Sequence, residues 1–249
     1  MMETSLKEEV IYLINEILSM GLDRDVTLWK VSSRWVNRSF NCTLEGIKTI
    51  CGGKCCHSQS YYPPRAGKHG MCDFLDLETG CLFSMEDKPI ICMIYPFILN
   101  ENNTLVIHHR SMNLHCKGNY GSGPRFMESL RGGLETTFGK IIVDYLMEAT
   151  ELGIDPIFEV DRNILETVKR EEKWAELSVN PEPRTSFPVI DNPKDGISRI
   201  VDRLMVVRSV EDLVGVSSFI EELYQEKELT VGLRFYLVYR IDHILSVIS

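Results

Sequence analysis

Apolar residues recur at helical spacing near the N-terminus of the chain. They are Leu6, Val10, Ile14 and Ile17. Their separation by three or four positions places them on one face of a helix. Ser5 and Glu8 have the spacing of a capping box, and Gly21 follows as a stop. The pattern predicts an amphipathic helix over residues 6–20.

The pattern then changes twice before residue 124. Residues 22–41 are undecided, because VTLWKV fits either a strand or the start of a second helix. From residue 42 to residue 123 the helical period disappears and turn formers crowd in, as in CGGKCC, YYPPRAGKHG, LETGC and NYGSGP. Here FIL and TLVIHH flank the turn-prone NENN, which predicts a β-hairpin. Such a loop-rich module takes its shape from something other than a large apolar core.

After Pro124 the helical pattern returns. One apolar face, interrupted by Gly132 and Gly133, is predicted from Phe126, Leu130, Leu134, Phe138, Ile141 and Tyr145. Further helices are predicted over 161–176, 195–208 and 210–227, the first opened by Asp161 and the last by Ser209 with Asp212 at the capping-box spacing.

Two C-terminal segments lack the clear helical pattern of their neighbours. Residues 178–193 carry four prolines, which exclude a regular helix and indicate a linker or a strap across the surface. The last twenty residues fit either a buried helix or a strand, because FYLV is apolar on every face. Arg234, Arg240 and Asp242 interrupt this stretch, which argues against a membrane span.

Composition and charge narrow the class of protein. The 249 residues are 44% hydrophobic and 25% charged, as in an ordinary globular protein. The net charge is −9, and the acidity lies in the second half, with 12 basic against 13 acidic residues over 1–124 and 15 against 23 over 125–249. This balance argues against a general nucleic-acid binder. The acidic half is instead solvated surface or a docking surface for a protein partner.

The N-terminal sequence bears on the compartment. It carries Glu3, Glu8 and Glu9 where an export signal needs positive charge and then an unbroken apolar run. We therefore expect a cytoplasmic protein, and the reducing cytosol disfavours disulfides.

The cysteines form the most informative pattern in the chain. All eight lie between residues 42 and 116, together with five of the six histidines. The cysteines are Cys42, Cys51, Cys55, Cys56, Cys72, Cys81, Cys92 and Cys116. Thiolates are soft anionic ligands for zinc, copper(I) and iron–sulfur clusters, and clustered cytosolic cysteines are more often metal ligands or catalytic thiols than bridges. The alternative is that they are buried apolar side chains, and this alternative is strongest for Cys42.

The spacing of the cysteines suggests how a metal would be held. The neighbours Cys55 and Cys56 point in divergent directions, so we expect them to serve different metals or two sides of one cluster. Gly52 and Gly53 would let the chain approach a metal closely and adopt positive φ. We predict an α+β protein, a small cysteine-rich metal-binding module with a hairpin embedded in a mainly α-helical chain. Its segments are residues 1–39, 40–123 and 124–249.

Other residues of the module have two interpretations each. His57 and His69 are either ligands, hydrogen-bond donors to a thiolate, or surface residues. At most one of His108 and His109 is expected to be functional, because they alternate on the hairpin. Asp73 and Asp76 either orient a ligand or cap turns. Lys88 either neutralises a thiolate site or is an ordinary exposed lysine. Tyr95, Pro96 and Phe97 are expected to pack the module's small core, and the alternative for Tyr95 is a hydrogen bond to a cluster sulfur.

The ordered series CGGKCC, CDFLD, GCLF, KPIICMIYPF and CKGNYGSG resembles the CxxCxxCC zinc- or iron-chelating family, the YkgJ-like cysteine-cluster proteins. The resemblance covers roughly residues 40–123. The matched positions are Cys55, Cys56, Cys72, Cys81, Cys92 and Cys116. The chain departs from the family's opening CxxC, where it has only Cys51 at short range, and it has Lys88 in place of the usual Arg.

The resemblance implies a bound zinc ion or iron–sulfur cluster with a scaffold or redox role. A related cysteine cluster in flagellin lysine N-methylases gives the alternative, a metal-dependent protein-modifying enzyme. No Gly-rich nucleotide fingerprint, phosphate loop or CxxxCxxC motif occurs in the sequence. Whether the protein is an enzyme therefore stays open, and no catalytic residue is assigned.

Overall fold

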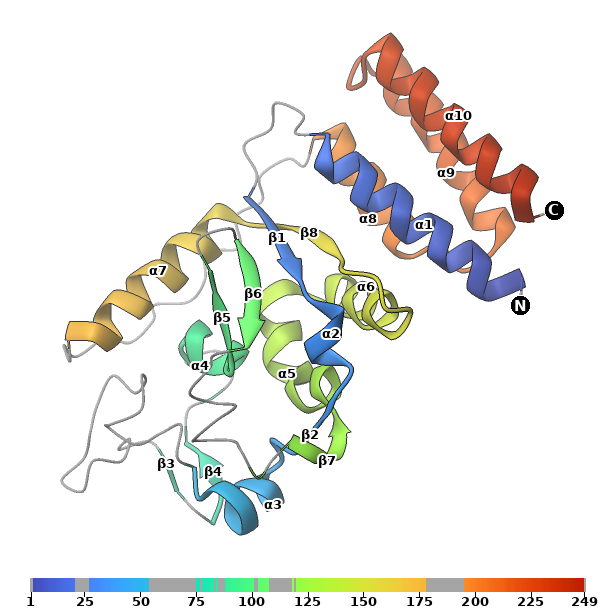
Figure 1. The fold of residues 1–249 in the computed structure, drawn as a ribbon. Coiled ribbons are helices and arrows are strands. Elements are labelled where there is room, and N and C mark those ends of the chain that lie inside the picture. Colours follow the sequence, from blue (N-terminus) through green and yellow to red (C-terminus); the bar gives the residue numbers. More distant parts are fainter. Residues whose placement is uncertain are drawn as a thin grey trace.

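The structure, a computed structural model, has the mixed α+β class that the sequence predicts (Figure 1). It describes residues 2–20, 27–53, 75–76, 78–82, 84, 88–100, 103–107, 118, 120–177 and 195–248. A group of helices lies at one end, a four-stranded sheet in the middle, and small strands and short helices at the other end (Figure 1).

The central sheet has the strand order β5-β6-β1-β8. Its strands are β1 (Thr27–Val31), β5 (Phe97–Leu99), β6 (Thr104–Ile107) and β8 (Ile157–Val160). The antiparallel pair β5 and β6 confirms the predicted hairpin, with Phe97 opposite Ile107. Strand β1 runs parallel to β6 and antiparallel to β8, so VTLWKV forms a strand. The sheet thus draws strands from all three predicted segments of the chain.

The chain ends form one helical group (Figure 1). It consists of α1 (Met2–Ser19), α8 (Gly196–Met205), α9 (Val210–Gln225) and α10 (Val231–Ile248). The face predicted for the first helix is confirmed, since Leu6, Val10, Ile14 and Ile17 are all buried. The helix begins at Met2, however, so Ser5 lies inside it and not at its cap.

The helices α8 and α9 both begin at residues whose side chains cap the first turn. Asp195 caps α8 by accepting a hydrogen bond from the Ser198 N–H, at 2.8 Å. Ser209 and Asp212 form the predicted capping box of α9. Within the last twenty residues, which fitted either element, Val231–Ile248 form the helix α10.

The middle of the chain forms three helices, α5 (Phe126–Phe138), α6 (Lys140–Glu151) and α7 (Arg162–Leu177). Helix α5 passes through Gly132 and Gly133 without a break, contrary to the predicted interruption. The break falls at Gly139, whose φ is 86°. Because α6 starts afresh there, Ile141 leaves the predicted apolar face and is exposed.

Aromatic residues pack in the core at both ends of α5. Trp29 of β1 packs edge to face against Phe138 and Phe158, with ring centroids 5.6 and 6.3 Å away. Phe126, at the other end of α5, stacks on Phe40 with centroids 4.7 Å apart. These contacts join the sheet to the small strands below it.

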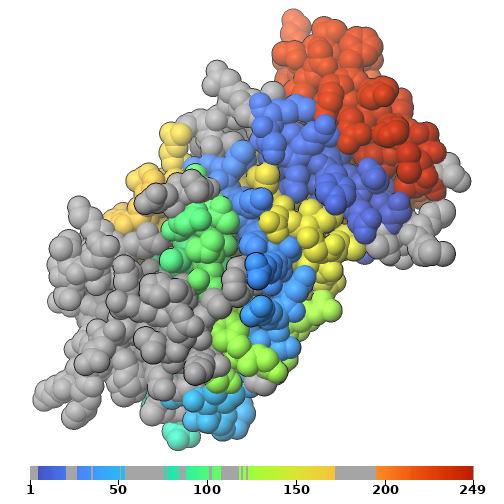
Figure 2. Space-filling model, viewed as in Figure 1, coloured from blue at the N-terminus to red at the C-terminus, as the bar shows by residue number. Residues whose placement is uncertain are grey.

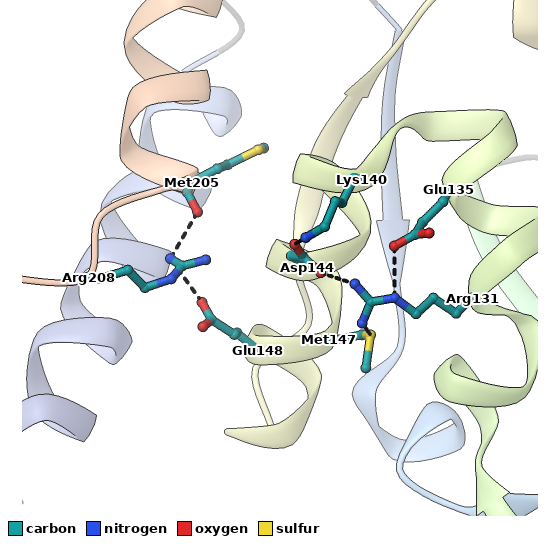
Figure 3. A network of polar contacts seen from close by, with 8 residues as sticks. All are labelled: Arg131, Glu135, Lys140, Asp144, Met147, Glu148, Met205 and Arg208. Carbon is teal, nitrogen blue, oxygen red and sulfur yellow. Dashed lines mark hydrogen bonds and ion pairs between the residues drawn. The ribbon is translucent and has the colours of Figure 1, made fainter.

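Polar contacts connect the helices to one another and to the sheet. Asn15 of α1 accepts hydrogen bonds from the Ile157 N–H at 2.8 Å and the Tyr145 hydroxyl at 3.1 Å, and its amide donates to the Asp155 carbonyl at 3.1 Å. In Figure 3, Arg131 of α5 contacts Asp144 of α6, and Glu148 of α6 pairs with Arg208 at 3.4 Å. The helical group is thereby tied to the rest of the molecule.

The remaining elements are short. They are α2 (Ser33–Val36), β2 (Ser39–Phe40), α3 (Leu44–Gly46), the π-helix η1 (Ile47–Cys51), β3 (Leu75–Asp76), β4 (Gly80–Cys81), α4 (Ile90–Ile94) and β7 (Tyr120–Arg125). Strand β2 pairs with β7, and β3 with β4. The predicted proline-rich strap, residues 178–193, lies outside the described residues. No helix in the described part of the chain is both long and apolar enough to cross a bilayer.

Candidate metal centre

The segment from Asn41 to Gly53 organises the cysteine-rich region. Thr43 caps α3, its hydroxyl oxygen accepting from the Gly46 N–H at 3.1 Å while the hydroxyl donates to the Asn41 side chain at 2.6 Å. Helix α3 runs directly into η1, which ends at Cys51. π-Helical turns are rare and frequently mark functional sites.

Gly52 and Gly53 follow Cys51 with φ values of 60° and 65°. The positive φ expected for this pair is therefore confirmed. The left-handed conformation suits glycine because other L-residues pay a steric penalty there. The pair turns the chain sharply at the point where the sequence continues to Cys55 and Cys56.

The β3–β4 hairpin presents Cys81. Leu75 lies opposite Cys81 in the register, and the Cys81 side chain is exposed. Asp76 holds the turn by accepting from the N–H groups of Glu78 and Thr79 at 2.8 and 2.7 Å. The Thr79 and Glu78 hydrogen bonds lower the pKa of Asp76. Of the two interpretations for Asp76, turn capping is the one that these contacts support.

The hairpin and a third segment both meet α3 and η1. Lys48 of η1 pairs with Glu78 of the hairpin at 3.4 Å. A β-carbon placed on Gly80 would lie 3.4 Å from Leu44 Cδ1, and one placed on Gly118 would lie 2.7 Å from Ile50 Cγ2. Segments far apart in the sequence, each adjoining a cysteine, therefore pack around η1.

Cys92 lies on a separate short helix that the core holds firmly. It is half-buried in α4 and packs against the hydrophobic core, as Cys42 does beside β2. The Glu171 carboxylate of α7 accepts from the Ile91 N–H at 3.1 Å, and Glu171 is only 3% exposed. Helix α5 also approaches α4 closely, because a β-carbon placed on Gly133 would lie 2.4 Å from the Met93 carbonyl oxygen. Both contacts fix the position of α4.

Glu171 was not predicted from the sequence as a functional or buried residue. Its position in α7 follows an ordinary helical pattern, and only the packing of α7 on α4 places its carboxylate at the first turn of α4. A glutamate at the start of a helix compensates the partial positive charge of the unpaired N–H groups. Tyr95, Pro96 and Phe97 are buried as expected, but Tyr95 and Phe97 belong to the large hydrophobic core that the helices and the central sheet share, and not to a small core of the module. Lys88 is half-buried, and its N–H donates to the Ser84 carbonyl at 3.1 Å.

The structure describes the side chains of only some of the predicted ligands. The side chains of Cys42, Cys81 and Cys92 are described, and none of these three is in a disulfide. Cys51 is described through its backbone alone. The predicted site residues outside the described ranges are Cys55, Cys56, Cys72, Asp73, Cys116, His57, His69, His108 and His109. Among the described side chains, no three from His, Cys, Asp and Glu lie close enough together to hold a metal ion.

Comparison with known proteins adds no relative. No protein-family model, curated protein or solved structure matches this chain. The resemblance to the zinc- or iron-chelating family thus rests on the quoted motifs alone.

Proposed function

We propose that the protein binds metal through its cysteine cluster, holding zinc or an iron–sulfur cluster in a scaffold or redox role. The ligands would be drawn from Cys42, Cys51, Cys55, Cys56, Cys72, Cys81, Cys92 and Cys116. The observation that carries the proposal is the packing of the β3–β4 hairpin and Gly118 against α3 and η1. That packing gathers separate cysteine-bearing segments around one short π-helix.

The sequence distances extend this argument to the other thiols. Four cysteines stand only two or three residues from Gly53, Leu75 or Gly118: Cys55, Cys56, Cys72 and Cys116. One residue of extended chain spans at most about 3.6 Å. These cysteines are therefore tied by short tethers to segments that meet at η1 or form the β3–β4 hairpin.

The donor set fits a thiophilic metal. Eight thiols would fill two tetrahedral sites of four sulfur ligands each, or surround a multinuclear cluster. A bound zinc would crosslink the loops, and an iron–sulfur cluster would supply one-electron chemistry. We propose a cytoplasmic protein, because thiols stay reduced in that compartment.

Elemental analysis and a visible spectrum of anaerobically purified full-length protein test the proposal. An iron–sulfur protein would be brown, absorb at about 400 nm and release sulfide on acidification. A zinc protein would be colourless and contain stoichiometric zinc that a chelator removes with loss of structure. Protein that is folded, colourless and free of stoichiometric metal would contradict the proposal.

Single substitutions test the role of the adjacent pair. Cys55→Ser and Cys56→Ser should each lower the metal content, because each thiol is proposed to serve its own coordination environment. Ser218→Ala is the control, since it removes an exposed hydroxyl of α9, at the other end of the molecule from the β3–β4 hairpin (Figure 1), and no thiol. Unchanged stoichiometry in both cysteine variants would refute the proposed role of the pair.

The proposal of an enzyme finds less support. A metal-dependent protein-modifying enzyme needs a substrate cleft beside the metal. Among the described residues, one pocket between α2, α5 and α6 contains no cysteine; it is lined by Val36, Asn37, Arg125, Met127, Glu128, Met147, Thr150 and Glu151. We propose instead that the acidic half, residues 125–249, serves as surface toward a protein partner and not toward nucleic acid.

A further inference from the structure

Helix α10 is apolar on the face that turns away from the core as well as on the face that packs. Leu237, Ile241 and Ile244 are fully buried against α1 and α9. The outward side chains are Val231, Phe235, Tyr239 and Val247, which are 52%, 63%, 68% and 59% exposed. Figure 2 shows this helix on the outside of the molecule, at the end opposite the small strands. Large apolar side chains that gather on one exposed helix face make that face a candidate for an interaction surface.

These four residues and the exposed His243 form a single ridge, spaced four residues apart from Val231 to Val247. In the commonest class of helix packing, ridges with this four-residue spacing interdigitate, and the two helix axes cross at about −50°. The five positions are evenly spaced about Tyr239, and a valine stands at each end. A two-fold axis near Tyr239 therefore brings the surface onto a copy of itself, as an isologous dimer requires.

We propose that this ridge, Val231 to Val247 of α10, is the interface of a homodimer in which two α10 helices pack antiparallel. Phe235 then lies beside His243 of the partner subunit. Val231 lies beside Val247 of the partner subunit, and Tyr239 beside its own symmetry mate. Each apolar end of one ridge meets an apolar end of the other.

The exposed area of the ridge reaches the lower bound of a specific interface. If a fully accessible aromatic side chain offers about 200 Å², the exposed fractions of Phe235 and Tyr239 leave roughly 260 Å² per copy. With the valines, His243 and the flanking residues, two copies bury on the order of 1,000 Å², about the lower bound for a specific interface.

The charges beside the ridge also favour a second copy. Arg234 pairs with Glu221 at 2.8 Å and Arg240 pairs with Glu16 at 2.9 Å, so both cations beside the ridge are neutralised within their own chain. Asp242 adds an exposed carboxylate beside His243. The face thus carries little net charge, and two chains of net charge −9 can meet there without strong repulsion. The proposal uses no cysteine and stands apart from the proposed metal centre.

Sedimentation equilibrium of the full chain over a wide concentration range tests the dimer. We expect a mass of twice 28.6 kDa at high concentration. Phe235→Glu should weaken the dimer by roughly 100-fold or more, because each dimer carries the change twice at a central aromatic position. Val214→Glu is the control, since Val214 is an exposed apolar residue of α9, 48% exposed, outside the ridge.

A second substitution tests the antiparallel register. Phe235 and His243 are two helical turns apart within one chain but adjacent across the proposed two-fold axis. Phe235→Glu combined with His243→Lys should therefore restore dimerisation, because the new carboxylate faces the new ammonium of the partner subunit. A wild-type chain that stays monomeric at every concentration, a dimer indifferent to Phe235→Glu, or a double variant as weak as Phe235→Glu would each overturn the proposal.

Discussion

Two neighbouring glycines of α5 provide a matched pair of substitutions. A β-carbon added to Gly132 would meet nothing within 4 Å. One added to Gly133 would stand 2.4 Å from the Met93 carbonyl oxygen, and 3.1 Å and 3.3 Å from the Met93 carbonyl carbon and Cα. Both glycines lie within the same helix, so the two variants differ in packing against α4 and not in helix propensity.

The magnitudes follow from these distances. Replacing glycine by alanine inside a helix favours folding by about 1 kcal/mol, so Gly132→Ala should stabilise the protein by roughly that amount. Gly133→Ala gains the same helix propensity but forces apart two backbones, which costs about 1–3 kcal/mol or more. The free energies of unfolding of the two variants should therefore differ by roughly 1–3 kcal/mol, with Gly133→Ala the less stable.

Urea unfolding followed by far-ultraviolet circular dichroism measures the difference. Because Met93 follows Cys92 in α4, native-state alkylation of Cys92 by iodoacetamide should also become faster in Gly133→Ala and stay unchanged in Gly132→Ala. Equal unfolding free energies in the two variants would refute the close approach of α5 to α4. The same conclusion would follow if both variants stabilised the protein.

Three further predictions concern other parts of the fold. Asn15→Ala removes the hydrogen bonds that the Asn15 side chain makes to β8, Tyr145 and Asp155, so the free energy of unfolding should fall by about 2–4 kcal/mol. Amide exchange at Ile157 should accelerate, and unchanged exchange would contradict this. Burial and then the nearby Glu16 raise the pKa of Tyr236 from 10.0 to about 12, so its contribution to stability is complete below pH 10.0 and lost as the pH rises toward 12. Tyr236→Phe should remove this alkaline loss, and an identical pH profile in the variant would argue against it. Gly52→Ala should destabilise the turn after Cys51 by about 1–2 kcal/mol, whereas Gly52→Asn, which tolerates positive φ, should cost less in the same unfolding assay.

Local signals in the sequence predicted much of the fold. The apolar face of α1, the β5–β6 hairpin and the capping box at Ser209 each depend on residues close together in the chain, and each is present in the structure. Positive φ at Gly52 and Gly53 belongs to the same group, because the conformation is a property of the residue itself.

Features that depend on packing between distant segments were not predicted from the sequence. Strand β8 is only four residues long and is recognisable as a strand only through its pairing with β1. Gly132 and Gly133 resemble helix breakers, yet Gly133 is needed for the approach of α5 to α4, while the break occurs at Gly139. The burial of Glu171 beside Ile91 likewise depends on contacts between segments eighty residues apart.

The proposed metal ligands stay a prediction from the sequence, made as a set of residues and not as a geometry. Clustering of the thiols identifies them, since eight cysteines in a turn-rich stretch exceed what a core of this kind needs. Which thiols share a metal is a matter of loop packing, and spacing alone permits several partitions. The meeting of the β3–β4 hairpin with η1 narrows the arrangement by bringing the surroundings of Cys51 and Cys81 together.

X-ray absorption spectroscopy at the edge of the bound metal tests the central claim most directly, with protein purified and kept without oxygen. The account predicts a stoichiometric metal whose inner shell is dominated by sulfur, at about 2.3 Å for zinc. An inner shell made only of nitrogen and oxygen, or folded protein that retains no metal, would contradict it.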